Sequence, residues 1–208
     1  MPMPTIRVHG FPLSGHCHRV ELMLSLLGLP FERLEVDLFN GAHKRPDFLA
    51  KNPFGQIPVF EDGEVVLADS NAILVYLATR YDRSRRWLPQ DPVAAAQVQR
   101  WLSVAAGELA HGPAAARLVA LFGMPLDAAR ARTIAGQLYG VLEAHLRIQG
   151  FLVGSEPTIA DVALYSYTAH APEGGVSLEP YPGVRAWLAR IEALPGFVAM
   201  PRSTLKAV

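Results

Sequence analysis

Four side chains that could do chemistry lie within five positions near the start of the chain. In the stretch from Gly10 to Gly28, Ser14, His16, Cys17 and His18 precede an apolar helical pattern. A serine hydroxyl can donate a hydrogen bond to an anion, a cysteine thiolate is a nucleophile, and an imidazole can move protons or bind a metal. Which of these groups acts depends on the elements that position them.

The first eighty residues alternate between strand and helix patterns. Residues 5–9 form a short β-branched run, and residues 31–38 alternate in the manner of a strand. An apolar stripe at helical spacing lies between them, made by Val20, Met23, Leu24 and Leu27. A helical turn at 47–51, a hairpin across Asp62-Gly63 and another helix follow. The order βαβαββα predicts that the first two strands are parallel, with a right-handed crossover.

The second half of the chain changes character. Residues 82–92 are charged and contain proline, which is typical of a linker between a domain at 1–81 and one at 93–208. The later region shows helical stripes without a convincing strand, so we expect an all-α bundle of about five helices. Thr158 and Asp161 form a capping box that predicts a helix running to about Ala171.

The composition limits the possible partners and compartments. Lys plus Arg equals Asp plus Glu at 19 each, so charge gives no reason to bind nucleic acid or an anionic membrane. One cysteine cannot form an internal disulfide, and the apolar runs are shorter than a membrane span. The first residues do not follow a signal-peptide pattern. We expect a cytoplasmic protein with no nucleic-acid or membrane partner.

Three segments together indicate a family. These are "GFPLSGHCHRVELMLSLLGLPFE", "NPFGQIPVFEDGEVVLADSNAILVYL" and "PTIADVALY". In order and spacing they resemble the cytosolic glutathione S-transferases, with features of the bacterial serine-type, phi, theta and beta branches. The resemblance covers essentially the whole chain. It implies a thioredoxin-like α/β domain that binds glutathione as co-substrate, an all-α domain that supplies the electrophile pocket, and a homodimer.

The resemblance also assigns glutathione contacts. A cis bond before Pro58 would turn the Ile57 backbone outward, to pair with the cysteinyl unit like an added strand. Ser70 would bind the γ-glutamyl carboxylate at a helix N-terminus, and Asp69 would face the α-ammonium. From the residues alone, a trans proline at a strand edge and plain helix caps remain alternatives. Three further positions match contacts to the glycyl carboxylate or the glutathione backbone: His43, Lys44 and Gln56.

Two residues compete for the role of acting on the thiol. Ser14 matches the activating serine of serine-type transferases, whose hydroxyl donates to sulfur and lowers a thiol pKa that is ordinarily about 8.5. Capping of the N–H of Cys17 is the structural alternative for Ser14. Cys17, near the first turn of a helix, could instead form a mixed disulfide with glutathione and support reduction. Phe11 stands where tyrosine-type members place their activating hydroxyl.

The neighbouring histidines do not indicate a metal site. His16, Cys17 and His18 are consecutive, and consecutive residues on a helix point in different directions, so they cannot close around one ion. We expect His16 to line the site and His18 to lie at the surface. Four residues are candidates for the electrophile pocket: Phe11, His16, Trp101 and His111.

The predicted function is that of a glutathione transferase, in detoxification. A glutathione thiolate would attack an electrophilic carbon of an apolar compound. Three alternatives remain: a glutathione-dependent isomerase of maleyl-type substrates, a disulfide reductase acting through Cys17, and a non-catalytic glutathione-fold interaction protein.

Overall fold

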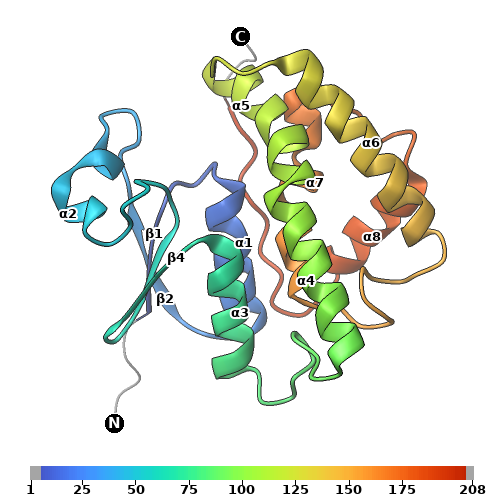
Figure 1. Cartoon of the computed structure of the whole chain (residues 1–208), viewed down its shortest axis with the longest axis horizontal. Helices are drawn as coiled ribbons and strands as arrows, with labels where there is room; N and C mark the ends of the chain where they lie inside the picture. Colours follow the sequence, from blue (N-terminus) through green and yellow to red (C-terminus); the bar gives the residue numbers. More distant parts are fainter. Residues whose placement is uncertain (1–5, 205–208) are drawn as a thin grey trace. The chain divides into compact units, whose positions relative to one another are not determined.

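The computed structural model describes residues 6–204 and divides the chain into two compact units (Figure 1). The first comprises the chain up to Arg83 together with Pro195–Pro201. The second comprises Ser84–Leu194 and the chain from Arg202. Each unit has its own buried core and is described by itself.

The first unit is built on a four-stranded mixed sheet. Its strands are β1 (Ile6–Gly10), β2 (Phe31–Glu35), β3 (Val59–Asp62) and β4 (Val65–Ala68), in the order β2-β1-β3-β4. β1 runs parallel to β2 and antiparallel to β3, and β3 and β4 form a hairpin. The predicted parallel pairing and hairpin are confirmed; the expected residue Thr5 of the first strand lies outside the described residues.

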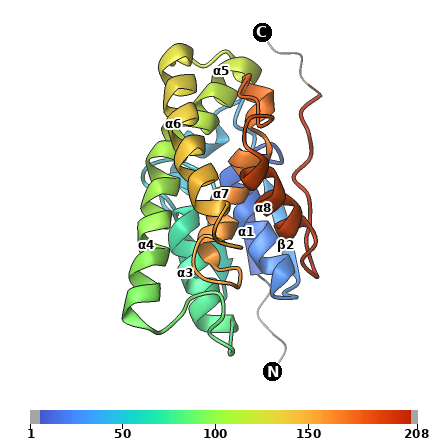
Figure 2. The ribbon, with the colours of Figure 1, turned by 90° about the vertical axis from the view of Figure 1, so that its right-hand side faces the viewer.

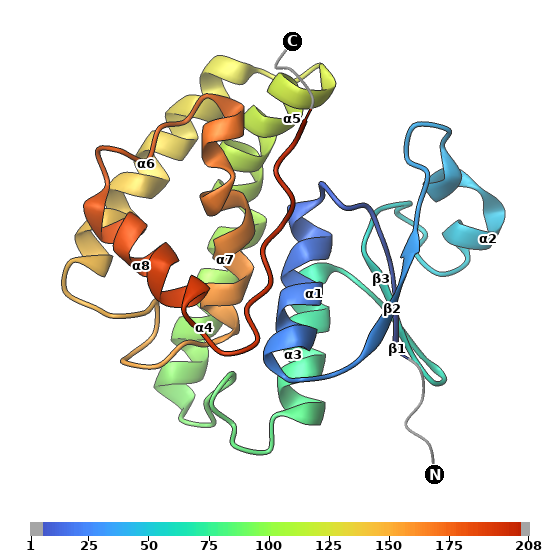
Figure 3. The ribbon, with the colours of Figure 1, turned by 180° about the vertical axis from the view of Figure 1, so that it is seen from behind.

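The helices of the first unit cover both faces of this sheet. α1 (Gly15–Leu26) and α3 (Ser70–Tyr81) lie against one face, and the short α2 (Pro46–Leu49), after a 3-10 turn at Ala42–Lys44, lies on the other side (Figures 1 and 3). The apolar stripe read from the sequence forms the core between α1, α3 and the sheet. Val20, Met23 and Leu24 of this stripe are fully buried, whereas Leu27 is half-buried. The side chains of α3 that are fully buried with them are Ile73, Leu74 and Leu77.

The second unit consists of helices, as the sequence predicts (Figure 2). A π-helical turn, η2, precedes α5, and a 3-10 turn, η3, follows α7. The elements are α4 (Pro92–Ala106), η2 (Ala110–Ala114), α5 (Ala115–Phe122), α6 (Ala128–Leu146), α7 (Ile159–Ala169), η3 (Ala171–Gly174) and α8 (Pro182–Glu192). None of the described helices is long and apolar enough to cross a membrane.

The predicted capping box starts α7, and its Asp161 also accepts hydrogen bonds from residues outside α7. Thr158 accepts from the N–H of Ala160, and Asp161 Oδ2 accepts from the N–H of Thr158 at 2.8 Å. Asp161 Oδ1 accepts from the N–H of Leu152 and from Trp187 Nε1, both at 2.9 Å. Burial raises the pKa of this carboxyl. One aspartate therefore joins the start of α7 to the preceding loop and to α8.

The two units divide the expected linker at 82–92 between them, at Arg83 and Ser84, and they also differ from the expected domains near the end of the chain. Residues 195–201, expected in the helical domain, are grouped with the first unit because they contact α1. Val198 O lies 2.9 Å from His18 Nε2, and Ser25 Oγ donates to Gly196 O at 2.6 Å. The expectation that His18 lies at the surface is wrong: the side chain is 3% exposed because this distant segment covers it.

Candidate active site

Ser14 ends the loop after β1 and caps α1. Its backbone N–H donates to Phe11 O at 3.0 Å, and its Oγ accepts from the N–H of Cys17 at 3.3 Å. The predicted capping bond is therefore present. A hydroxyl that accepts through a lone pair still carries a proton that it can donate. The first turn of α1 contains no acidic residue, so its N–H groups and dipole favour an anion beside Ser14.

Cys17 lies in the core rather than in the site. The side chain is 1% exposed, and a Cβ atom added at Gly10 would lie 2.9 Å from its Sγ. Burial raises the pKa of the thiol to about 11, although the neighbouring Ser14 side chain acts in the opposite direction. A buried, protonated thiol is a poor nucleophile. The structure therefore gives no support to reduction through Cys17, one of the two roles expected from the sequence.

The two neighbouring histidines serve different parts of the first unit. His18 contacts residue 198, as described above, whereas His16 Nδ1 lies 3.2 Å from Ser70 Oγ in α3. Burial and the charge of Arg19 lower the pKa of His16 to about 3, so the imidazole is neutral at ordinary pH. Among the described residues, no group of three or more His, Cys, Asp or Glu side chains is placed to hold a metal ion.

The N-terminus of α3 is the second constituent of the site. Asp69 caps it by accepting from the N–H of Ala72 at 2.9 Å and adopts φ 70°, a left-handed conformation that is uncommon outside glycine. Such strain is concentrated at functional sites. Arg19, which is 1% exposed, donates from Nη1 to Ser70 Oγ at 3.3 Å and to Asn71 Oδ1 at 2.9 Å. Arg19 was not among the candidates from the sequence, because its contacts join α1 to α3 across more than 50 positions.

The loop before β3 holds the proline. The Ile57–Pro58 bond is cis, as the resemblance implies. The side chain of Asn52, which is 3% exposed, donates to Gln56 O at 2.7 Å and accepts from the N–H of Phe54 at 3.1 Å. The Gln56 side chain is exposed, whereas Ile57 is half-buried. Asn52 is a second residue that the sequence did not single out.

The 3-10 turn lies against the same loop. Lys44 Nζ donates to Gly55 O at 2.9 Å and to Phe54 O at 3.3 Å. A Cβ atom at Gly55 would lie 2.8 Å from His43 O, so this close approach requires a glycine there. Burial lowers the pKa of His43. The structure therefore brings His43 and Lys44 against Phe54 and Gly55, in the loop that leads to Gln56 and Ile57.

The pocket candidates have different environments. Phe11 packs edge-on against Phe39, with ring centroids 5.9 Å apart. Trp101 is 1% exposed in the core of the second unit and donates from Nε1 to Leu152 O at 3.0 Å, so it has almost no surface to offer a substrate. The expectation for Trp101 is corrected accordingly. His111 is exposed in η2, with Nδ1 2.9 Å from Gly107 O.

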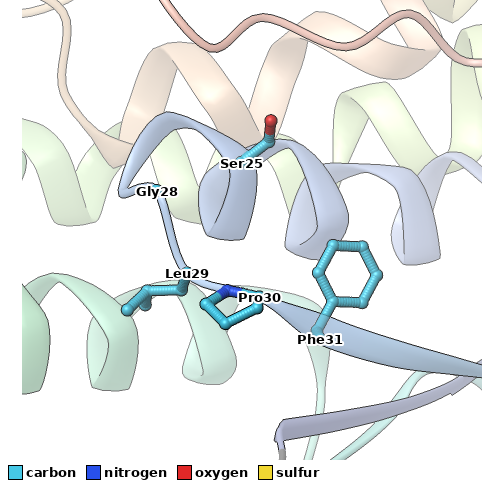
Figure 4. A pocket seen from close by; sticks show the side chains of 5 residues that line it. All are labelled: Ser25, Gly28, Leu29, Pro30 and Phe31. Atoms are coloured by element: carbon cyan, nitrogen blue, oxygen red, sulfur yellow. The ribbon is translucent and has the colours of Figure 1, made fainter.

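One surface pocket lies away from these residues. Its volume is about 450 Å³, and its lining comes from the end of α1 and the start of β2 (Figure 4). The residues are Ser25, Gly28, Leu29, Pro30 and Phe31. They contribute one hydroxyl and no charged group, so we do not place the chemistry there.

Comparison with known proteins gives the family. Two family models match, described as the N-terminal domain of glutathione S-transferase at residues 4–79 and the C-terminal domain at residues 125–195. Glutathione S-transferase 3 of Zea mays is 39% identical, over 94% of this chain and 92% of its own. A glutathione S-transferase structure from Pseudomonas fluorescens is 37% identical with a TM-score of 0.87, covering 95% of this chain and 99% of that one. A Drosophila mojavensis homologue with bound glutathione is 30% identical with a TM-score of 0.82, over 93% and 90%.

These matches span both units of the chain. The chain belongs to the glutathione S-transferase family.

Proposed function

We propose that the protein conjugates glutathione to an electrophilic apolar compound and that Ser14 activates the thiol. The Ser14 hydroxyl donates to the glutathione sulfur while its lone pair caps Cys17 N–H. Hydrogen bonding to the charged form, together with the N-terminus of α1, lowers the thiol pKa and increases the fraction of nucleophilic thiolate. The position of Ser14 at the N-cap of α1 is the observation that carries this proposal.

Glutathione binds along three groups of backbone and side chains in the first unit. The Ile57 backbone pairs with the cysteinyl unit ahead of Pro58. Ser70 binds the γ-glutamyl carboxylate through its N–H and hydroxyl, and Asp69 faces the α-ammonium. The glycyl end extends to the loops that hold His43, Lys44 and Gln56. Lys44 donates to the carbonyls of Phe54 and Gly55, so it also fixes the loop shape beside the ligand.

The thiolate test uses the Ser14→Ala variant. Glutathione is titrated into both proteins, and thiolate absorbance is followed against pH. Removing a hydrogen bond to a charged group costs about 1.5–3 kcal/mol, so the bound thiol pKa should rise by about 1–2 units while glutathione still binds. Ser14→Thr, which retains a hydroxyl, should keep most of the depression. Equal thiol pKa values in wild type and Ser14→Ala would leave Ser14 as a helix cap only.

The proposal also covers the second substrate, the oligomeric state and the cellular location of the protein. Phe11, His16 and His111 are retained as candidates for lining the electrophile pocket, and the substrate is a small apolar compound in a detoxification reaction. We expect a cytoplasmic homodimer, which sedimentation velocity would detect as twice the chain mass of 22.6 kDa. Turnover of a maleyl-type substrate without loss of glutathione would instead support the isomerase alternative. Absence of glutathione binding would leave the interaction protein.

A further inference from the structure

The Ser70 hydroxyl lies between two side chains of α1. Arg19 Nη1 is 3.3 Å from Ser70 Oγ, and His16 Nδ1 is 3.2 Å from the same oxygen. Within the described part of the chain, these are the two side chains at hydrogen-bonding distance from this hydroxyl. Ser70 is 4% exposed and Arg19 is 1% exposed, so the contact is well shielded from solvent. Arg19, Ser70 and His16 therefore form one hydrogen-bonded group.

The chemistry of the three groups gives these hydrogen bonds a direction. A guanidinium can only donate, so Ser70 accepts from Arg19. A hydroxyl that accepts from a cation becomes a stronger donor to its second partner. His16 is neutral, so one of its ring nitrogens is an acceptor. The positive charge of Arg19 favours a lone pair rather than a proton on the ring nitrogen that faces Ser70. The hydrogen bonds therefore run from Arg19 to Ser70 and from Ser70 to His16.

We propose that His16 competes with the γ-glutamyl carboxylate for the hydroxyl hydrogen bond of Ser70 and thereby limits the affinity for glutathione. This inference rests on the role of Ser70 in the proposed function. The hydroxyl has one proton, and it cannot donate fully to two acceptors. A carboxylate accepts more strongly than a neutral imidazole, so the ligand displaces His16. The free energy of glutathione binding is therefore reduced by the loss of the hydrogen bond between Ser70 and His16. His16 is a specificity-determining residue and takes no part in bond making.

The competition predicts that removing a polar side chain strengthens binding. Glutathione and 4-aminobutanoyl-cysteinyl-glycine, which lacks only the α-carboxylate, are titrated calorimetrically into wild type and His16→Ala. A net hydrogen bond corresponds to a roughly three- to tenfold change in Kd. His16→Ala should therefore bind glutathione about three- to tenfold more tightly and bind the decarboxylated analogue as wild type does. His16→Asn, which keeps an acceptor near Nδ1, should return glutathione affinity toward the wild-type value.

A double-substitution cycle separates competition from a change in fold. In the Ser70→Ala background there is no hydroxyl to compete for, so His16→Ala should no longer alter the Kd for glutathione. Equal changes for glutathione and the analogue, or weaker glutathione binding by His16→Ala, would overturn the proposal. If wild type itself does not prefer glutathione over the analogue, the assignment of the carboxylate to Ser70 fails, and the competition fails with it.

The tautomer of His16 is an independent readout. In protein labelled with ¹⁵N at histidine, the chemical shifts distinguish Nδ1–H from Nε2–H rings. The proposal requires the Nε2–H form of His16 before glutathione is added and a shift of the Nδ1 resonance when it binds. An Nδ1–H ring before addition would mean that His16 donates to Ser70, which contradicts the proposed direction.

Discussion

Cys17 shows how far a reactive residue type can be from reactive chemistry. Its thiol is buried against Gly10, and its pKa is raised to about 11 by burial. We therefore expect Cys17→Ala to retain glutathione conjugation, with a loss of about 1 kcal/mol of stability from the sulfur-sized cavity. Conjugation kinetics and urea unfolding measure the two effects. A loss of kcat matching that of Ser14→Ala would return Cys17 to the site.

The burial of Cys17 could have been read from the sequence, whereas that of His18 could not. Cys17 precedes Val20 by three positions and Leu24 by seven, so it extends the apolar stripe of α1. From the sequence, Cys17 was weighed as a nucleophile and was not counted as part of this stripe. His18 is covered by a segment 180 residues later in the chain. A contact between such distant residues leaves no periodic signal near either of them.

At the scale of elements, Asp161 does more than cap a helix. It accepts from the N–H of Thr158, from the N–H of Leu152 and from Nε1 of Trp187. All three donors are buried. Asp161→Ala leaves these donors without partners, so we expect a loss of about 3 kcal/mol or more in urea unfolding. Asp127→Ala is the matched control: Asp127 is an exposed cap that accepts from Arg130 N at 2.9 Å, and its loss should cost about 1 kcal/mol. Equal costs would show that the additional bonds of Asp161 add nothing.

The sequence predicted this capping box but not its other two bonds. Thr158 and Asp161 are three positions apart, which is the spacing that the local motif requires. The bond to Trp187 joins α7 to α8 across 26 positions and depends on how the helices pack. The same holds for the glutathione-binding segment. The motif that contains Pro58 and Ser70 could be recognised in the sequence, whereas the hydrogen bond from Arg19 in α1 to Ser70 in α3 depends on how the two helices pack.

The buried ion cluster of the second unit makes its stability depend on pH. Arg117 Nε donates to Glu173 at 2.6 Å, and His170 Nδ1 lies 3.2 Å from the same carboxylate. Burial acts to raise the pKa of Glu173, but Ser203 N–H and Arg117 hold it below its usual value. Burial lowers the pKa of His170. For both groups the unfolded chain binds the proton more readily, so stability is lost as pH falls below about 6.5 for His170 and about 4.3 for Glu173.

Substitution of Glu173 tests this sign. Glu173→Gln removes the negative charge that compensates the buried Arg117. We therefore expect the free energy of unfolding at pH 7 to fall by roughly 3 kcal/mol. The remaining stability should then change less between pH 5 and pH 3 than it does in wild type. Urea midpoints at several pH values measure both effects. A wild-type slope below pH 5 that survives in Glu173→Gln would assign the acid sensitivity to other carboxylates.

At the scale of the whole molecule, the order of the elements was predictable, but the place of the last residues was not. The residues after α8 contribute first to one unit and then to the other: Gly196 and Val198 contact α1, and Ser203 donates to Glu173. Segments without periodicity give no sequence signal for where they pack. The helical domain expected from 93 to 208 therefore included residues that the structure groups with the first unit.

Met200 tests whether this segment stabilises the first unit. It is 4% exposed, whereas Met124 in the second unit is 45% exposed. Truncating a buried methionine typically costs 2–5 kcal/mol, so Met200→Ala should lose at least about 2 kcal/mol, while Met124→Ala should stay within about 0.5 kcal/mol of wild type. Hydrogen exchange should place the loss in α1 and the sheet, because two units need not unfold as one. Unchanged protection of α1 in Met200→Ala would show that the segment covers the helix without stabilising it.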